Sequence, residues 1–224
     1  MKRIIIISLL LMSSLLSLDI AIAETPAPIR ERIEWCNVWI TNADQDDLPR
    51  VLFVGDSITQ GYFGPTEKLI ADKANCARIT SSRSVCDPIY FDELSLILKQ
   101  YDFEVIHVNN GLHGWGYTEE QYRAGLEKLL IMLITSAPDT KLIWAASTPV
   151  KAHSGMSANA HRVALRNRIA TELVATKGIP VNDLYSLVED HDEYFRDDGV
   201  HFNEDGRNAQ AEQVAGVVLK VMGE

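Results

Sequence analysis

One stretch near the start of the chain decides the fold: Arg50-Val51-Leu52-Phe53-Val54-Gly55-Asp56-Ser57-Ile58-Thr59-Gln60-Gly61. Its run of four apolar residues is rich in β-formers and predicts a short buried strand. The glycine directly after this run lets the backbone turn sharply. Ser57 is therefore expected just past the carboxyl end of a strand, at the edge where ligands bind in open α/β sheets.

Two interpretations of Ser57 follow from this position. If a helix begins at or just after Ser57, the free N–H groups of its first turn point at whatever the hydroxyl attacks, and they favour an oxyanion. Alternatively, Asp56 and Ser57 only cap the helix, as Asp and Ser often do. The stretch by itself leaves both interpretations open, so the rest of the chain has to distinguish them.

Strand and helix patterns alternate along the rest of the chain, which predicts an α/β fold. A parallel sheet of five strands covered on both faces, a three-layer α/β/α sandwich, accounts for this alternation. After Ser57, Gly61 and Gly64-Pro65 predict an interruption, with a short helix over 67–73. After the first strand, the later ones are predicted near 77–80, 105–108, 142–146 and 179–181.

The chain divides into three parts. Residues 1–23 have a basic head, an apolar core and the small residues Ala21 and Ala23, so they predict a secretory signal cleaved after Ala23. The protein is accordingly expected to be secreted or periplasmic. Residues 24–48 predict a linker and an arm that docks on the domain. Residues 49–224 predict a single domain, because the mature chain of about 200 residues can bury one full core.

Charge and cysteine content exclude several classes of partner. Without residues 1–23, 19 basic and 30 acidic residues remain, a net charge of about −11. An acidic, unclustered surface argues against nucleic acid and anionic membranes as partners.

No cysteine follows the apolar core, so we expect no lipid anchor, and the oligomeric state is left open. Export permits a disulfide, for which Cys76 and Cys86 close the shortest loop, while Cys36 makes the number odd.

A serine hydroxyl needs a base, and the base usually needs a carboxylate that orients it. His201 lies in a loop before the last predicted helix, and Asp198 precedes it by three residues with Gly199 between them. One short loop can therefore hold both the base and its orienting group beside Ser57. The alternative is an ordinary surface turn. His107, inside a predicted strand, is expected to be a packed core residue.

Gly55-Asp56-Ser57-Ile58-Thr59 together with Asp198-Gly199-Val200-His201 resembles the two end motifs of the SGNH hydrolases, also called the GDSL esterase family. The resemblance implies a flavodoxin-like sheet, with Ser57 as nucleophile, His201 as base and Asp198 as its support. It also implies an oxyanion hole built from the Ser57 N–H, a backbone glycine N–H and an Asn side chain. It implies no metal and no organic cofactor.

The two middle motifs depart from the family pattern. In Ser84-Val85-Cys86-Asp87, Cys86 takes the place of the glycine, so a backbone N–H survives but a side chain enters the rim. In Gly111-Leu112-His113-Gly114, His113 falls where Asn is expected, and an imidazole N–H can donate to an oxyanion as an amide can. Asn109 or Asn110 supplies the amide if the register slips, and His113 is then a structural loop residue. Trp115 is a weaker candidate for substrate binding, since a lone Trp is more often packing.

These residues predict a secreted serine esterase that hydrolyses short acyl esters, above all acetyl groups on carbohydrate. The expected partner is a small-molecule or glycan ester, and the sugar assignment rests on export and on the family analogy alone. An acyltransferase of the same fold is one alternative. A non-catalytic carbohydrate-binding domain is the other, and an intact Ser, His and Asp argue against it.

Overall fold

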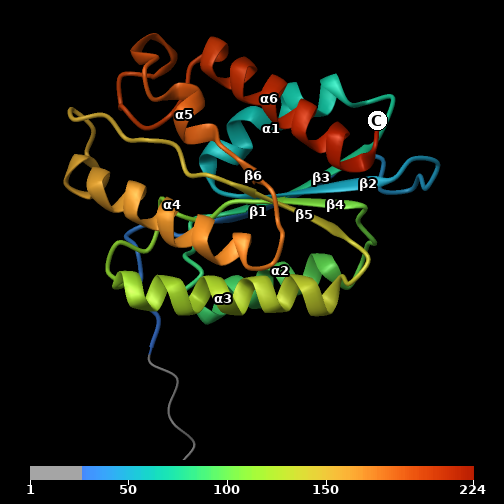
Figure 1. Cartoon of the computed structure of the whole chain (residues 1–224), viewed down its shortest axis with the longest axis horizontal. Coiled ribbons are helices and arrows are strands. Elements are labelled where there is room, and N and C mark those ends of the chain that lie inside the picture. Colours follow the sequence, from blue (N-terminus) through green and yellow to red (C-terminus); the bar gives the residue numbers. More distant parts are fainter. Residues whose placement is uncertain (1–26) are drawn as a thin grey trace, which may run out of the picture.

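The computed structural model describes residues 27–224, so the expected signal segment 1–23 lies outside the described residues. One sheet is enclosed by two layers of helices (Figure 1). The strands are β1 (Cys36–Ile40), β2 (Arg50–Gly55), β3 (Asn75–Ser81), β4 (Val105–Val108), β5 (Lys141–Ala145) and β6 (Val181–Asn182). The helices are α1 (Ser57–Leu69), α2 (Pro88–Leu98), α3 (Glu119–Ser136), α4 (Ala160–Ala175), α5 (Leu184–Val188) and α6 (Glu204–Met222), with 3₁₀ turns at Ser157–Asn159 and Asp192–Tyr194.

The sheet has the order β1-β3-β2-β4-β5-β6, and β2 to β6 are parallel. This confirms the predicted five-stranded parallel sheet, whose strand order is that of flavodoxin-like folds. The strand order reverses at β2, because β3 continues on one side of it and β4 on the other. Ligands bind at the carboxyl end of such a switch point. The segments that leave β2 and β4 are therefore the first place to look for a site.

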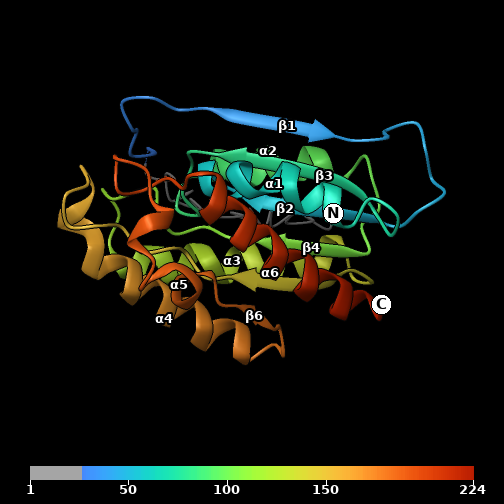
Figure 2. The same ribbon diagram turned by 90° about the horizontal axis from the view of Figure 1, so that it is seen from above.

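A sixth strand was not predicted. β1, from the 24–48 arm, pairs antiparallel with β3, with Cys36 opposite Ser81 and Ile40 opposite Ala77. It forms one edge of the sheet, and β6 lies at the other (Figure 2). Most of β1 is exposed, so it lacks the apolar alternation that marks a half-buried strand. The arm is thus part of the sheet.

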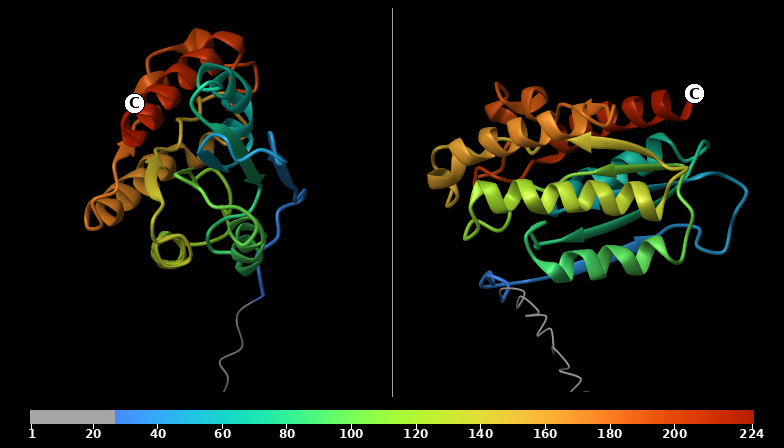
Figure 3. Two further views of the ribbon diagram at one scale, coloured as in Figure 1. Left: turned by 90° about the vertical axis from the view of Figure 1, so that its right-hand side faces the viewer. Right: turned by 60° about the horizontal axis from the view of Figure 1, so that its bottom comes forward.

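The two faces of β2 bury different layers of the core. Val51 and Phe53 pack in the cluster with α1 and α6, whereas Leu52 and Val54 pack in the cluster with α2 and α3. The left panel of Figure 3 shows these helical layers on opposite sides of the sheet. Burial on both faces explains why β2 has a continuous apolar run. Within residues 27–224, no helix is both long and apolar enough to cross a bilayer.

The predicted interruption after Ser57 is wrong. α1 runs without a break through Gly61, Gly64 and Pro65. Buried Tyr62 and Phe63 anchor the helix in the core, so tertiary packing outweighs the local breakers.

Gly55 is needed for a different reason from the one predicted. Its φ is not in the left-handed region, so the turn itself does not require a glycine. A Cβ at Gly55 would instead lie 2.0 Å from Oγ1 of Thr59. The first turn of α1 therefore folds directly over the end of β2, and only a residue without a side chain allows this approach.

The possible disulfide between Cys76 and Cys86 does not form. All three cysteines are free thiols. Cys76 is buried in the cluster with α1 and α6, and Cys86 packs against the cluster on the opposite face of the sheet. The sheet separates the two thiols.

His107 is a buried core residue, as predicted. It lies in β4, fully buried, and its Nε2 is 3.0 Å from Nδ2 of Asn182. Burial lowers the pKa of His107 to about 3. The unfolded chain takes up a proton on this ring below about pH 6.5, whereas the folded chain does not until about pH 3. Protonation therefore favours the unfolded chain as the pH falls through this window.

We expect the free energy of unfolding to fall by about 2 kcal/mol between pH 6 and pH 4 on account of His107. His107→Gln removes the titrating group, so its unfolding free energy should depend less on pH over this window. Urea unfolding at a series of pH values measures both slopes. His161→Gln, at an exposed position of α4, is the control and should keep the wild-type slope. Equal slopes for wild type and His107→Gln would contradict the prediction.

Candidate active site

Ser57 is the first residue of α1, directly after the turn that leaves β2. Asp56 is the N-cap of this helix and accepts a hydrogen bond from the Ile58 N–H at 2.9 Å. The capping interpretation therefore holds for Asp56. It does not hold for Ser57, because the Ser57 hydroxyl lies 2.9 Å from Nε2 of His201.

His201 links Ser57 to a carboxylate. Its Nδ1 lies 2.8 Å from Oδ2 of Asp198, in the same short loop. Gly199 has φ 66° in this loop, a left-handed conformation that glycine adopts without strain. The structure thus brings Ser57, His201 and Asp198 into one chain of contacts, as the spacing of the motifs predicts.

The backbone holds Asp198 in its ionised form. Its Oδ1 accepts the N–H groups of His201 at 2.8 Å and of Val200 at 2.9 Å. Burial acts to raise the pKa of Asp198, but these backbone hydrogen bonds, together with the His201 side chain, lower it to about 2. A carboxylate only accepts, so Nδ1 of His201 carries the proton. In the neutral ring, Nε2 is then a bare acceptor facing the Ser57 hydroxyl, which suits a base.

The loop after β4 brings His113 to the same edge of the sheet. Nδ1 of His113 is 2.9 Å from Oε2 of Glu31, and the Trp35 ring meets the imidazole edge to face at a centroid distance of 6.4 Å. Both partners come from the arm. Sequence reasoning missed them, because neither residue belongs to a recognisable motif and both lie far from His113 in sequence.

Asn109 cannot supply the oxyanion donor that the alternative register requires. Its Nδ2 donates to the carbonyl of Ala145 at 2.7 Å and to Oγ of Ser147 at 3.0 Å, so both amide protons are used inside the core. Asn110 donates from Nδ2 to the carbonyl of Arg83 at 2.9 Å and accepts the Val85 N–H through Oδ1 at 3.2 Å. Asn109 therefore ties the end of β4 to the end of β5, and Asn110 ties it to the loop that follows β3.

The structure also argues against Cys86 as an oxyanion donor. Its N–H points to Oγ of Ser84 at 3.3 Å, within its own turn. The same nitrogen lies against α3, because a Cβ on Gly125 would be 3.2 Å from it. The Cys86 turn thus packs its backbone onto α3. Of the oxyanion donors predicted from the sequence, the Ser57 N–H and His113 remain.

Solved structures of ester hydrolases share this architecture. An aryl esterase from M. smegmatis has a TM-score of 0.62 at 17% identity, covering 77% of this chain and 99% of its own. A GDSL-like lipase from Bacteroides thetaiotaomicron has a TM-score of 0.62 at 14% identity, covering 76% and 88%. An acetyl xylan esterase has a TM-score of 0.61 at 18% identity, covering 75% and 99%. The fold is that of the SGNH hydrolases.

At these identities the likeness establishes the SGNH hydrolase fold, and the predicted fold is confirmed. No family model matches the sequence, and the search of curated proteins also finds no match. The roles of individual residues therefore have to be argued from the geometry of this chain.

A fully buried arginine on α4 organises the loop that carries His113. Arg166 donates to the carbonyls of Gly111 at 3.0 Å, His113 at 2.7 Å and Gly114 at 3.1 Å. Its guanidinium also lies over the Trp115 ring, 4.3 Å from the centroid. This contact indicates that Trp115 packs against Arg166. A contact between Trp115 and substrate stays a prediction.

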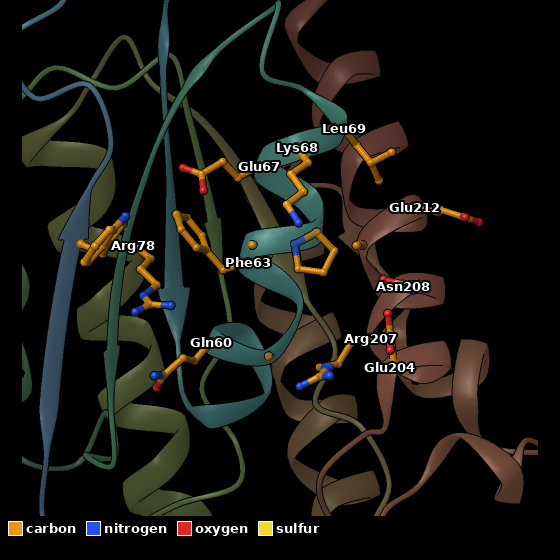
Figure 4. A pocket seen from close by; sticks show the side chains of 15 residues that line it. Gln60, Phe63, Glu67, Lys68, Leu69, Arg78, Glu204, Arg207, Asn208 and Glu212 are labelled. Carbon is orange, nitrogen blue, oxygen red and sulfur yellow. The ribbon is translucent and has the colours of Figure 1, made fainter.

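A polar groove of about 890 Å³ lies between α1, α6 and the β1 edge. Figure 4 shows Gln60 on α1 and Glu204 and Arg207 on α6 gathered at one end of it. Gln60 is one helical turn beyond Ser57 along α1, so this is the end of the groove that lies nearer to Ser57 along the helix. Trp39, which is 57% exposed, also lines the groove. Among residues 27–224 no group of three or more His, Cys, Asp or Glu side chains is arranged to hold a metal.

We expect Arg166→Gln to lower the free energy of unfolding by about 3–5 kcal/mol, because it leaves three buried carbonyls without their donor and removes one of the two arginines that pair with Glu119. Chemical denaturation of the purified variant measures this loss. Arg123→Gln is the matched control, since Arg123 forms an exposed pair with Glu172 and should lose less than about 1 kcal/mol. Similar losses in the two variants would contradict the assignment.

Proposed function

We propose that the protein is a serine esterase of the SGNH hydrolase family, which cleaves carboxylic esters through an acyl-enzyme. The observation that carries this proposal is the contact chain from Ser57 Oγ to His201 Nε2 at 2.9 Å and from His201 Nδ1 to Asp198 at 2.8 Å. A nucleophile, a base and an orienting carboxylate in this order are what acyl transfer to serine requires. A binding module has no need of the three together.

In the proposed mechanism, Ser57 Oγ attacks the ester carbonyl carbon while His201 Nε2 takes the hydroxyl proton. The tetrahedral intermediate collapses as His201 returns this proton to the departing alkoxide, which leaves as the alcohol. A water molecule then attacks the acyl-enzyme and gives its proton to the same nitrogen. Collapse of the second intermediate breaks the Ser57 ester, and the proton returns to Ser57 Oγ. Asp198 keeps the ring in one tautomer and stabilises the imidazolium.

The oxyanion of each intermediate is stabilised by the Ser57 N–H and by His113. The Ser57 N–H is one of the first-turn donors of α1 that have no partner within the helix, and the helix dipole favours negative charge at this end. His113 reaches the same edge from the loop after β4, the neighbouring strand at the switch point. Donors from two adjacent strand ends suit an oxygen that develops charge between them.

We further propose that the substrate carries a short acyl group, such as acetyl, on a carbohydrate. An exposed site supports a bulky carrier, because His201 and Asp198 are 41% and 46% exposed. The groove beside α1 offers Trp39 as a flat surface for a sugar ring and polar side chains for its hydroxyls. Easy access of water favours hydrolysis over acyl transfer to another alcohol. Secretion through residues 1–23 belongs to the same proposal.

Ser57→Ala should lower kcat for p-nitrophenyl acetate by at least about 10⁴-fold, since no other group supplies the nucleophile. Asp198→Asn should lower kcat less, by about 10²–10⁴-fold, because it disturbs only the tautomer of His201. Initial rates after subtraction of the uncatalysed reaction measure both effects. His161→Gln, at an exposed position of α4, is the control and should retain the wild-type rate. Equal rates for Ser57→Ala and wild type would exclude the esterase.

Trp39→Ala should raise KM for an acetylated glycan polymer by about 3–10-fold through loss of stacking, and leave KM for p-nitrophenyl acetate unchanged. Acetate release from the polymer measures the first value. Val38→Ala, the adjacent exposed residue of β1, is the matched control and should change neither KM. A Trp39→Ala variant that handles the polymer like wild type would rule out this groove as the sugar site.

A further inference from the structure

The carboxylate of Glu31 forms hydrogen bonds with two residues of the loop after β4, His113 and Gly114. Oε2 of Glu31 lies 2.9 Å from Nδ1 of His113, and Oε1 accepts the N–H of Gly114 at 2.8 Å. Two contacts from one rigid carboxylate set both the position of the loop and the plane of the ring. Glu31 itself belongs to the arm, just before β1, so it reaches the site from outside the parallel sheet.

The arm is anchored on both sides of Glu31. Before it, the Ile29 N–H donates to the hydroxyl of Tyr117 at 2.7 Å. After it, Trp35 exchanges hydrogen bonds with Ser82, and β1 continues the pairing along β3. Glu31 is therefore held in place by the sheet and does not depend on His113 for its position.

The contact with Glu31 decides which protons His113 carries. An ionised carboxylate only accepts, so Nδ1 of His113 must hold a proton. In a neutral ring Nε2 would then be bare, and a bare nitrogen repels an oxyanion. His113 can donate from Nε2 only if the ring is an imidazolium with both nitrogens protonated. Nε2 takes part in no hydrogen bond within residues 27–224, so it is free for a substrate oxygen.

The charges around His113 favour the imidazolium. Burial lowers the pKa of His113, and so does the positive charge of Arg166. The hydrogen bond to Glu31 and the negative charges of Asp56 and Glu31 have the opposite effect and are stronger, so the pKa is raised. Oδ2 of Asp56 is buried without a hydrogen-bond partner in the described part of the chain, while Oδ1 of the same carboxylate accepts the Ile58 N–H.

We propose that Glu31 is a positioning residue that keeps His113 doubly protonated, so that the Nε2–H of His113 donates to the oxyanion formed at Ser57. The inference rests on the proposed esterase function. Activity then needs His201 neutral and His113 charged. Raising the pH through the pKa of His113 removes the donor, so kcat falls on the alkaline side.

The test is the pH dependence of kcat for p-nitrophenyl acetate. Glu31→Gln loses the charge, and its amide oxygen can replace only one of the two carboxylate oxygens that accept from Nδ1 and from the Gly114 N–H. The alkaline limb of kcat should therefore move to lower pH by about one unit or more. Within the wild-type alkaline limb this lowers kcat by about 10-fold with little change in KM, because the donor acts only in the transition state. Glu34→Gln, in the same arm and paired with Arg30 and Arg83, is the matched control and should keep the wild-type limb.

His113→Asn gives a second test, because an amide donates without titrating. This variant should lack the alkaline limb of His113, and Glu31→Gln added to it should cause no further shift. A purely structural role of Glu31 would instead reduce the rate at every pH in both backgrounds. An unchanged limb in Glu31→Gln, or an equal shift in Glu34→Gln, would overturn the inference.

The two proposals fail separately. If hydrolysis does not depend on Ser57, the esterase function is wrong whatever the pH profile. If hydrolysis depends on Ser57 and Glu31→Gln leaves the alkaline limb in place, only the role of Glu31 is wrong. A ¹⁵N titration of His113 supplies a readout without turnover: Glu31→Gln should release the second ring proton at lower pH, and an unchanged titration would refute the inference.

Discussion

The hydrogen bond between Ser57 Oγ and His201 Nε2 joins two residues that are 144 positions apart in the chain, and the rest of the site is arranged around it. Each residue lies at or just before the amino end of a helix, α1 or α6, and these two helices pack against each other on one face of the sheet. Their packing sets the distance between hydroxyl and imidazole. Asp198 adds a local constraint, because its loop fixes the ring from the other side.

The second half of the site depends on a buried cation. Arg166 lies beneath the His113 loop and satisfies three of its carbonyls, which would otherwise be without partners in a dry interior. Glu119 neutralises Arg166 from α3. Loop, arginine and carboxylate therefore form one connected polar network, in which removing one member leaves the others exposed to an apolar surrounding. Such a network can hold a loop rigidly without regular secondary structure.

The arm contributes more than an extra strand. Its pairing with β3 brings Glu31 and Trp35 to His113, so residues outside the parallel sheet define the environment of a ring at its edge. In the proposed mechanism a histidine replaces the neutral amide that the SGNH hydrolase pattern places there. A titrating donor needs a carboxylate to hold its charge, and the arm provides one. Stability of the edge strand and chemistry at Ser57 are thereby coupled.

Much of the fold could be predicted from the sequence, because it depends on local patterns. The Ser57–His201 contact spans 144 residues and was predicted from the two end motifs and the resemblance that they carry. A continuous apolar run predicts a strand buried on both faces, and Asp198 and His201 interact within one short loop. The unpredicted features all depend on contacts that are distant in sequence. Only tertiary packing decided that α1 runs through Pro65 and that Glu31 contacts His113 across 82 residues. It also decided that the N–H groups of Asn109 and Cys86 donate to acceptors within the protein. Pairwise hydrogen bonds between distant loops leave no periodicity in the chain, so the sequence carries no pattern that indicates them.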